Sequence, residues 1–166
     1  LQNTADPAVF SYLPQLGLLD AAHHQGAGLI QVDEAIGAST VVTPGKISAG
    51  EGADGPHTEV MTIANSGSES VTYSLTHIDA IGTNPVYEDG PSASQNDPGF
   101  FLDAASVTFS HDSVTVPAGS QVEVTVTVAP DPESIPGTQY TGFVVLTDEE
   151  GETLSVPFAG MSGDYG

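Results

Sequence analysis

The sequence contains no cysteine and no tryptophan, and Lys46 is its only lysine or arginine. The absence of cysteine excludes disulfides, iron–sulfur clusters, thiolate zinc sites and a cysteine nucleophile. With 22 acidic residues the formal net charge is −21, so the chain has almost no cations to set against phosphates. We therefore expect no nucleic-acid partner and no attraction to anionic membrane surfaces. No apolar run approaches the roughly 18 residues of a membrane-spanning helix, so we expect no membrane insertion.

The remaining composition indicates a folded protein with an acidic surface. Hydrophobic residues make up 39% of the 166 residues, which is too many for a chain kept disordered by its charge. Glycine and proline, at 19 and 12 residues, are spread along the chain as turn residues, a pattern typical of many short strands. The sequence starts at Leu1 without a methionine or a signal segment, and we interpret it as a processed or excised product.

From Thr40 onward the sequence predicts a mainly β fold. The clearest strand covers residues 121–128 (QVEVTVTV), in which four valines share one face while glutamate and threonines share the other. Further strands are expected at 58–64, 71–78, 107–109, 114–116, 140–146 and 153–158, with a hairpin turn at 148–151. This series predicts an immunoglobulin- or fibronectin-like antiparallel β-sandwich. The long, polar stretch between Ile78 and Asp103 is expected to be a loop with a functional role.

Residues 1–37 follow neither the helical nor the strand period. They are rich in apolar side chains but too short to bury them within one segment, so we expect them to pack against a partner. At most a short helical turn is predicted at 31–36, ended by Gly37. The apolar residues of this segment are Leu1, Val9, Phe10, Leu13, Leu16, Leu18, Leu19, Leu29, Ile30, Val32 and Ile36.

No cofactor or metal site is predicted. A dinucleotide-binding loop at Gly26 and Gly28 would need a third glycine where Gln31 stands. Adjacent histidines on an extended segment point in opposite directions, so we interpret the histidines as ordinary surface or core residues rather than ligands; they are His23, His24, His57, His77 and His111. The EF-hand pattern is missing, and calcium at the acidic turns 88–89 or 148–150 is left open.

No catalytic residue is predicted either. The sequence lacks a G-x-S-x-G nucleophile elbow. The nearest approach is Gly160-Met161-Ser162-Gly163, which follows the last expected strand. Serine, histidine and aspartate are all present, but nothing in their spacing suggests a triad.

Four segments carry a specific resemblance to subtilisin-like serine proteases. Residues 1–5 (LQNTA) and 25–32 (QGAGLIQV) resemble the L-x-x-T-A and Q-G-A-G-L-V-D segments late in the catalytic domain of this family. Residues 71–75 with 114–120 are similar to the fibronectin type III-like domain that follows it, and 156–160 with 163–164 resemble the end of that domain. The order and spacing are most similar to the Vpr-type and lactocepin-like cell-envelope proteases.

The resemblance implies that residues 1–37 are the C-terminal remnant of a catalytic domain and that 38–166 form a fibronectin-like sandwich. The family's catalytic triad lies upstream, and its G-T-S-M-A stretch is absent here. The chain would then be a non-catalytic portion of a secreted serine endopeptidase, bracing the catalytic domain and contributing to substrate access. Its partners would be the rest of that domain and, through the parent enzyme, a protein or peptide substrate. The alternative is a free-standing secreted adhesion or carbohydrate-binding module, which should show a row of exposed aromatics.

Overall fold

Two β-sheets packed face to face form the sandwich in the computed structural model, which describes residues 1–85, 98–102 and 104–164. The first sheet has the strand order β1-β3-β8-β6; its strands are β1 (Thr40–Thr43), β3 (His57–Asn65), β8 (Ser120–Ala129) and β6 (Ser106–Phe109). The second sheet has the order β2-β10-β9-β4-β5, and β7 also pairs with β4. Its strands are β2 (Ile47–Glu51), β10 (Thr153–Met161), β9 (Gln139–Asp148), β4 (Val71–Pro85), β5 (Pro98–Leu102) and β7 (Ser113–Val116).

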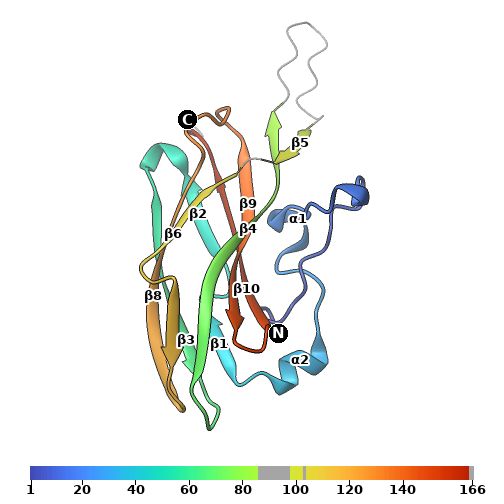
Figure 1. The fold of residues 1–166 in the computed structure, drawn as a ribbon. Helices are drawn as coiled ribbons and strands as arrows, with labels where there is room; N and C mark the ends of the chain where they lie inside the picture. Colours follow the sequence, from blue (N-terminus) through green and yellow to red (C-terminus); the bar gives the residue numbers. More distant parts are fainter. Residues whose placement is uncertain (86–97, 103, 165–166) are drawn as a thin grey trace, which may run out of the picture.

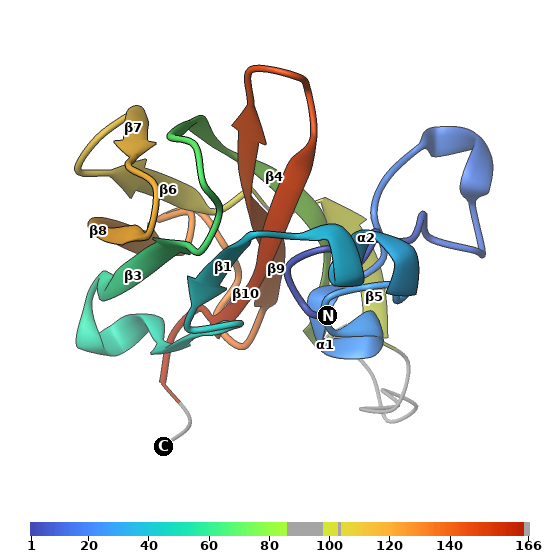
Figure 2. The same ribbon diagram turned by 90° about the horizontal axis from the view of Figure 1, so that it is seen from below.

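The helices are short and lie outside the two sheets. The 3-10 helix η1 (Pro14–Leu16) and the α-helices α1 (Ala22–Gln25) and α2 (Val32–Gly37) belong to the N-terminal segment, whereas η2 (Gly52–Asp54) follows β2. Figure 1 shows this segment beside β9 and β10, and Figure 2 shows it as a third layer against the second sheet. No helix in the described part of the chain is long and apolar enough to cross a membrane.

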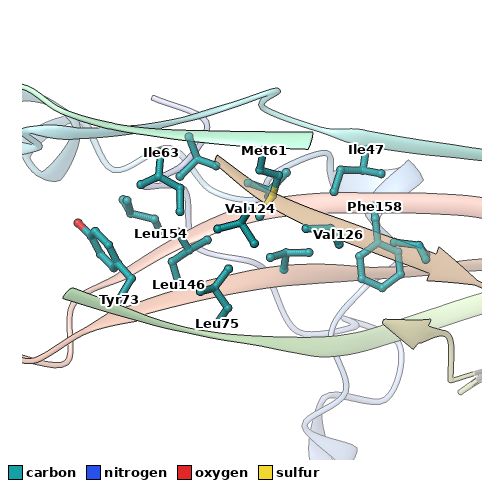
Figure 3. Close-up of a cluster of buried hydrophobic side chains, with 14 of the residues drawn as sticks. Ile47, Met61, Ile63, Tyr73, Leu75, Val124, Val126, Leu146, Leu154 and Phe158 are labelled. Carbon is teal, nitrogen blue, oxygen red and sulfur yellow. The ribbon is translucent and has the colours of Figure 1, made fainter. Parts of the chain in front are cut away.

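The core between the sheets confirms the predicted sandwich. Val124, Val126 and Val128 are completely buried, as the alternation in β8 predicts, and Val122 packs against the same cluster. Figure 3 shows Val124 and Val126 among side chains from both sheets, with Tyr73 near one end of the cluster and Phe158 toward the other. The side chains labelled there are Ile47, Met61, Ile63, Tyr73, Leu75, Val124, Val126, Leu146, Leu154 and Phe158.

The predicted loop between Ile78 and Asp103 is wrong where the structure describes it. Strand β4 continues to Pro85 and pairs antiparallel with β5, in a register that runs from Ile81 opposite Leu102 to Pro85 opposite Pro98. The strand could not be predicted because this stretch is polar and lacks apolar residues at alternate positions. Backbone hydrogen bonds can hold such a hairpin together without that pattern. Residues 86–97 and 103 lie outside the described residues, and with them the acidic turn 88–89.

Candidate docking surface

The N-terminal segment is hydrogen-bonded through its backbone to two strands of the second sheet. The Ser155 N–H of β10 donates to the Asn3 carbonyl at 2.8 Å, and the Ile81 N–H of β4 donates to the Leu19 carbonyl at 3.0 Å. Leu19 also forms an isolated parallel bridge with Ala80. The segment thus forms backbone hydrogen bonds with strands β10 and β4. The irregular spacing of its apolar residues did not predict this pairing.

Asn3 connects the segment to both sheets. Its side chain is buried, and its Oδ1 accepts a hydrogen bond from the Val42 N–H of β1 at 3.0 Å. Its Nδ2 donates to the Ser155 carbonyl of β10 at 3.4 Å. In the sequence, Asn3 was noted only as part of the segment 1–5 that resembles the protease family. A single asparagine in an irregular segment does not indicate which groups its side chain will bond.

A small apolar cluster lies beneath the segment. Phe143 is completely buried, although it points away from the main core, and it packs with Ala22 and Ala80. The Thr141 hydroxyl accepts a hydrogen bond from the Ala22 N–H at 3.1 Å and donates to the Ile81 carbonyl at 3.1 Å. Burial on both faces explains why β9 has apolar residues on consecutive positions, as strands covered on two sides do.

The segment leaves much of its own apolar surface in contact with solvent. Leu29 is 69% and Ile36 is 82% exposed, and their neighbours are exposed to a similar degree. We define the docking surface as Leu1, Leu29, Ile30, Val32 and Ile36, all of which are more than half exposed. A second exposed group consists of Val9, Tyr12, Leu13 and Leu16. Exposed apolar side chains of this size are those through which a chain can contact a partner.

Each histidine has a close neighbour among the described residues, and His111 Nδ1 lies 3.0 Å from the Ser110 hydroxyl. The rings of His23 and His24 in α1 meet edge to face at 4.4 Å between centroids. His24 Nδ1 lies 3.2 Å from Asp20 Oδ1. His57 lies 3.4 Å from Glu59, and His77 lies 3.8 Å from Asp79. No group of three or more histidine and acidic side chains that could hold a metal ion occurs in the described part of the chain.

Gly28, Ser162 and Asp148, which lie in the sequence motifs considered above, each make a contact that stabilises the local fold. A Cβ at Gly28, whose φ is +111°, would collide with the backbone of Asp6, so this glycine allows a close backbone approach. The Ser162 hydroxyl is buried against the Ile135 carbonyl at 2.6 Å. Asp148 Oδ1 accepts hydrogen bonds from the backbone N–H groups of Glu150 and Glu152, both at 2.9 Å, so it stabilises the β9–β10 hairpin.

Two titratable groups of the N-terminal segment have shifted pKa values. Burial, followed by the neighbouring His24, lowers the pKa of His23, and Asp20 opposes this effect. Desolvation, followed by the carboxylates of Asp6, Asp33 and Glu152, raises the pKa of Glu34 above its ordinary value of 4.5. Negative charge is therefore concentrated around α2.

We expect Glu34→Gln to raise the melting temperature at pH 7 and low salt. A carboxyl whose pKa is higher in the folded chain contributes stability that is present at low pH and lost as the pH rises through the folded pKa. The gain from the amide should therefore vanish near pH 4, where Glu34 is protonated, and shrink with added salt. Calorimetry at both pH values checks this. The control is Glu123→Gln, which makes the same charge change on the first sheet. An equal rise in melting temperature for this variant would show that the acidic neighbours of Glu34 are not the cause.

Comparisons with known proteins add three findings. Residues 53–159 match the family model of the Fn3-like domain. Over 98% of its length the chain is 30% identical to the PI-type proteinase of Lactococcus lactis subsp. cremoris and to the PII-type proteinase of Lacticaseibacillus paracasei. The chain spans only 9% of the length of each of these proteinases.

A solved structure shares the fold. The ASH/PapD-like domain 7 of human CEP192 superposes with a TM-score of 0.52 and 15% sequence identity, covering 77% of this chain and 87% of that one. At this identity the likeness concerns the β-sandwich alone.

Proposed function

Because the chain belongs to the Fn3-like domain family, we propose that it is the non-catalytic β-sandwich portion of a secreted subtilisin-like serine endopeptidase. The proteinases that it resembles are far longer, and the similarity extends over 98% of this chain. The similarity therefore includes the N-terminal segment as well as the sandwich. The family model, in contrast, begins at residue 53. This difference supports a division into a catalytic-domain remnant at 1–37 and a sandwich domain at 38–166.

The observation that carries the proposal is the docking surface. One side of the N-terminal segment is buried on the second sheet, while Leu1, Leu29, Ile30, Val32 and Ile36 remain exposed on it. A segment with apolar residues on both sides is suited to lie between two domains. Each domain then removes one set of its side chains from water. The sandwich would in this way brace the catalytic domain through residues 1–37.

The β4–β5 hairpin supports a part in substrate access. Figures 1 and 2 both place β5 near α1, on the same side of the sandwich as the N-terminal segment. A catalytic domain that extends from the docking surface past α1 would have this hairpin beside it.

The adhesion or carbohydrate-binding alternative finds less support among the described side chains. Among the side chains that the structure describes, Tyr12 is the one aromatic residue that is mostly exposed to solvent, at 81%. Tyr73, Tyr140, Phe143 and Phe158 are buried, so the described residues offer no row of aromatic rings for a sugar to stack on.

We expect Ile36→Glu to reduce the thermal half-life of peptidase activity in the longer protein that contains the catalytic domain. A charge in an apolar contact loses hydration without gaining a partner, so the half-life should fall several-fold. The isolated chain should lose at most a few degrees of melting temperature, because Ile36 is 82% exposed there and the new charge meets only the acidic side chains around α2. A serine-directed fluorophosphonate probe should label the catalytic domain and leave this chain unlabelled.

Ile135→Glu is the matched control, since Ile135 is 50% exposed on a turn between β8 and β9. It should leave the half-life unchanged. Equal half-lives for the Ile36→Glu protein and the unmodified protein would overturn the bracing role, and stoichiometric labelling of a serine in this chain would overturn its non-catalytic character.

A further inference from the structure

Residues 8–20 form a loop that extends away from both sheets and from α2 (Figures 1 and 2). Its tip carries the second exposed apolar group, in which Tyr12 is 81% and Leu16 is 57% exposed. Residues 11–17 are all exposed. The sequence from 7 to 19 contains no acidic, basic or histidine residue, although the net charge of the chain is −21. The 8–20 loop therefore presents an uncharged, apolar tip to solvent on an acidic chain.

The shape of the 8–20 loop is stabilised by its own backbone. The Phe10 N–H donates to the Leu18 carbonyl at 2.8 Å, and the Asp20 N–H donates to the Ala8 carbonyl at 2.9 Å. The 3-10 helix η1 lies at the tip and ends at Gly17, whose φ of +66° favours glycine. The loop is thus an irregular hairpin with a defined shape.

The side chain of Gln25 joins the two ends of the loop. Its Oε1 accepts a hydrogen bond from the Ala8 N–H at 2.6 Å, and its Nε2 donates to the Ala8 carbonyl at 3.2 Å and to the Asp20 carbonyl at 2.7 Å. Gln25 belongs to α1, whose Ala22 is buried against Phe143 of the second sheet. Gln25 therefore connects the loop to a helix that is packed on the sandwich, so the tip is ordered before any partner binds.

An ordered apolar tip is suited to contact with another protein surface. A loop that already has its bound shape loses little conformational freedom on association, and covering Tyr12 and Leu16 removes apolar surface from water. A lipid surface fits less well, because the net charge of −21 repels anionic lipids. Asp6 and Asp20, one on each side of the uncharged stretch, add to this repulsion.

The catalytic domain is the partner that the comparisons favour, and this choice rests on the proposed function. The loop lies outside residues 53–159, which match the Fn3-like family model, and within the 98% of the chain that is similar to the proteinases. The stretch that contains it is thus related to the proteinases and not to the Fn3-like domain. The chain spans only 9% of the length of the PI-type proteinase, so a protein of that kind has further polypeptide that can cover the tip.

We propose that the 8–20 loop forms a second contact with the catalytic domain, separate from the docking surface, in which its tip packs among apolar side chains of that domain. The two contacts lie on different parts of the N-terminal segment, one at the loop and one around α2 (Figure 1). A single contact leaves a bound domain free to pivot, whereas two separate contacts fix its orientation. Gln25 is the positioning residue, because it holds the ends of the loop together.

The test is hydroxyl-radical footprinting, in which the oxidation rate of a side chain reports its exposure to solvent. The isolated chain is compared with the longer protein that contains the catalytic domain. We expect the oxidation of Tyr12 and Leu16 to slow several-fold in the longer protein. Ile135, which is 50% exposed on the turn between β8 and β9, is the control and should be oxidised at the same rate in both proteins.

Gln25→Ala tests the positioning role. In the isolated chain it should speed the hydrogen exchange of the Phe10 and Asp20 amides several-fold, while the amides of β8 keep their rates. In the longer protein it should restore part of the oxidation of Tyr12. Gln121→Ala removes an exposed glutamine side chain from β8 and should change none of these rates. Unaltered exchange at Phe10 and Asp20 in Gln25→Ala would show that Gln25 does not hold the loop.

Equal oxidation of Tyr12 in the two proteins would overturn the second contact. The oxidation of Ile36, measured in the same samples, separates this failure from failure of the proposed function. Protection of Ile36 without protection of Tyr12 removes the loop contact and keeps the bracing role, whereas protection of neither removes both. Protection of Tyr12 without Ile36 supports the loop contact and removes the docking surface.

Two further results would assign the tip to a different partner and overturn the proposal. One is co-sedimentation of the isolated chain with phosphatidylcholine vesicles, which would indicate a lipid contact. The other is protection of Tyr12 that increases with the concentration of the isolated chain, which would indicate a second copy.

Discussion

Val124→Asp is expected to unfold the sandwich at room temperature or to lower its melting temperature by well over ten degrees. Val124 is completely buried in the centre of β8, opposite Met61 of β3, and Lys46, the chain's one lysine or arginine, does not belong to the cluster around it. Burying an unpaired carboxylate costs several kcal/mol, a large part of the roughly 5–15 kcal/mol that stabilise a typical domain. Thermal unfolding followed by circular dichroism measures the effect.

Thr125→Asp is the matched control for this prediction. It introduces the same charge one residue later, on the face of β8 that points away from the core, and should lower the melting temperature by only a few degrees. Equal melting temperatures for Val124→Asp and the unmodified chain would show that the assigned face of β8 is wrong.

Phe143→Ala is expected to loosen the N-terminal segment as well as to destabilise the chain. The ring is completely buried between β9 and the segment, against Ala22 and Ala80. Truncating a buried phenylalanine typically costs about 3–5 kcal/mol through lost burial and the cavity that remains. Because this ring belongs to the contact with the segment and not to the core between the sheets, we expect part of the loss to appear as local opening.

Hydrogen exchange separates local opening from global unfolding. The amides of Ile81 and Ser155 donate to carbonyls of the segment, so in Phe143→Ala they should exchange faster than the amides of β8. Phe158→Ala removes a ring of the same size from the main core, and there the two sets of amides should accelerate together. If both sets change equally in Phe143→Ala, the contact between segment and sheet does not open on its own.

The sandwich was predictable from the sequence because its strongest signal is local. Each valine from Val122 to Val128 alternates with a polar residue, and a strand with one buried face must show this period. The turn at Asp148–Gly151 could be predicted for the same reason, since its residue types are those that a tight hairpin needs. The resemblance to a family of proteases, by contrast, came from motif order and not from any period.

The contacts of the N-terminal segment could not be predicted in the same way. Asn3 and Thr141 are polar residues whose partners lie 39 and 119 positions away for one of their bonds each, and no local pattern encodes such a distance. The one available signal was the run of apolar residues in β9, which indicates burial on both faces. The proximity of Glu152 to Glu34, which helps to raise the pKa of Glu34, was equally hidden, because these are two of 22 acidic residues and only the fold brings them together.

The bond between Asn3 and Val42 has a consequence for self-association. Strand β1 lies at the end of its sheet and pairs with β3 on one side only, so its other side is open to a strand from a second molecule. The Asn3 side chain occupies the Val42 N–H on that open side, and the segment that carries it also covers Phe143. A chain cut back to residues 38–166 would expose both an unpaired strand edge and an apolar patch, which together favour edge-to-edge aggregation. The segment therefore covers a strand edge and an apolar patch that would otherwise favour self-association, in addition to any contact it makes with a larger protein.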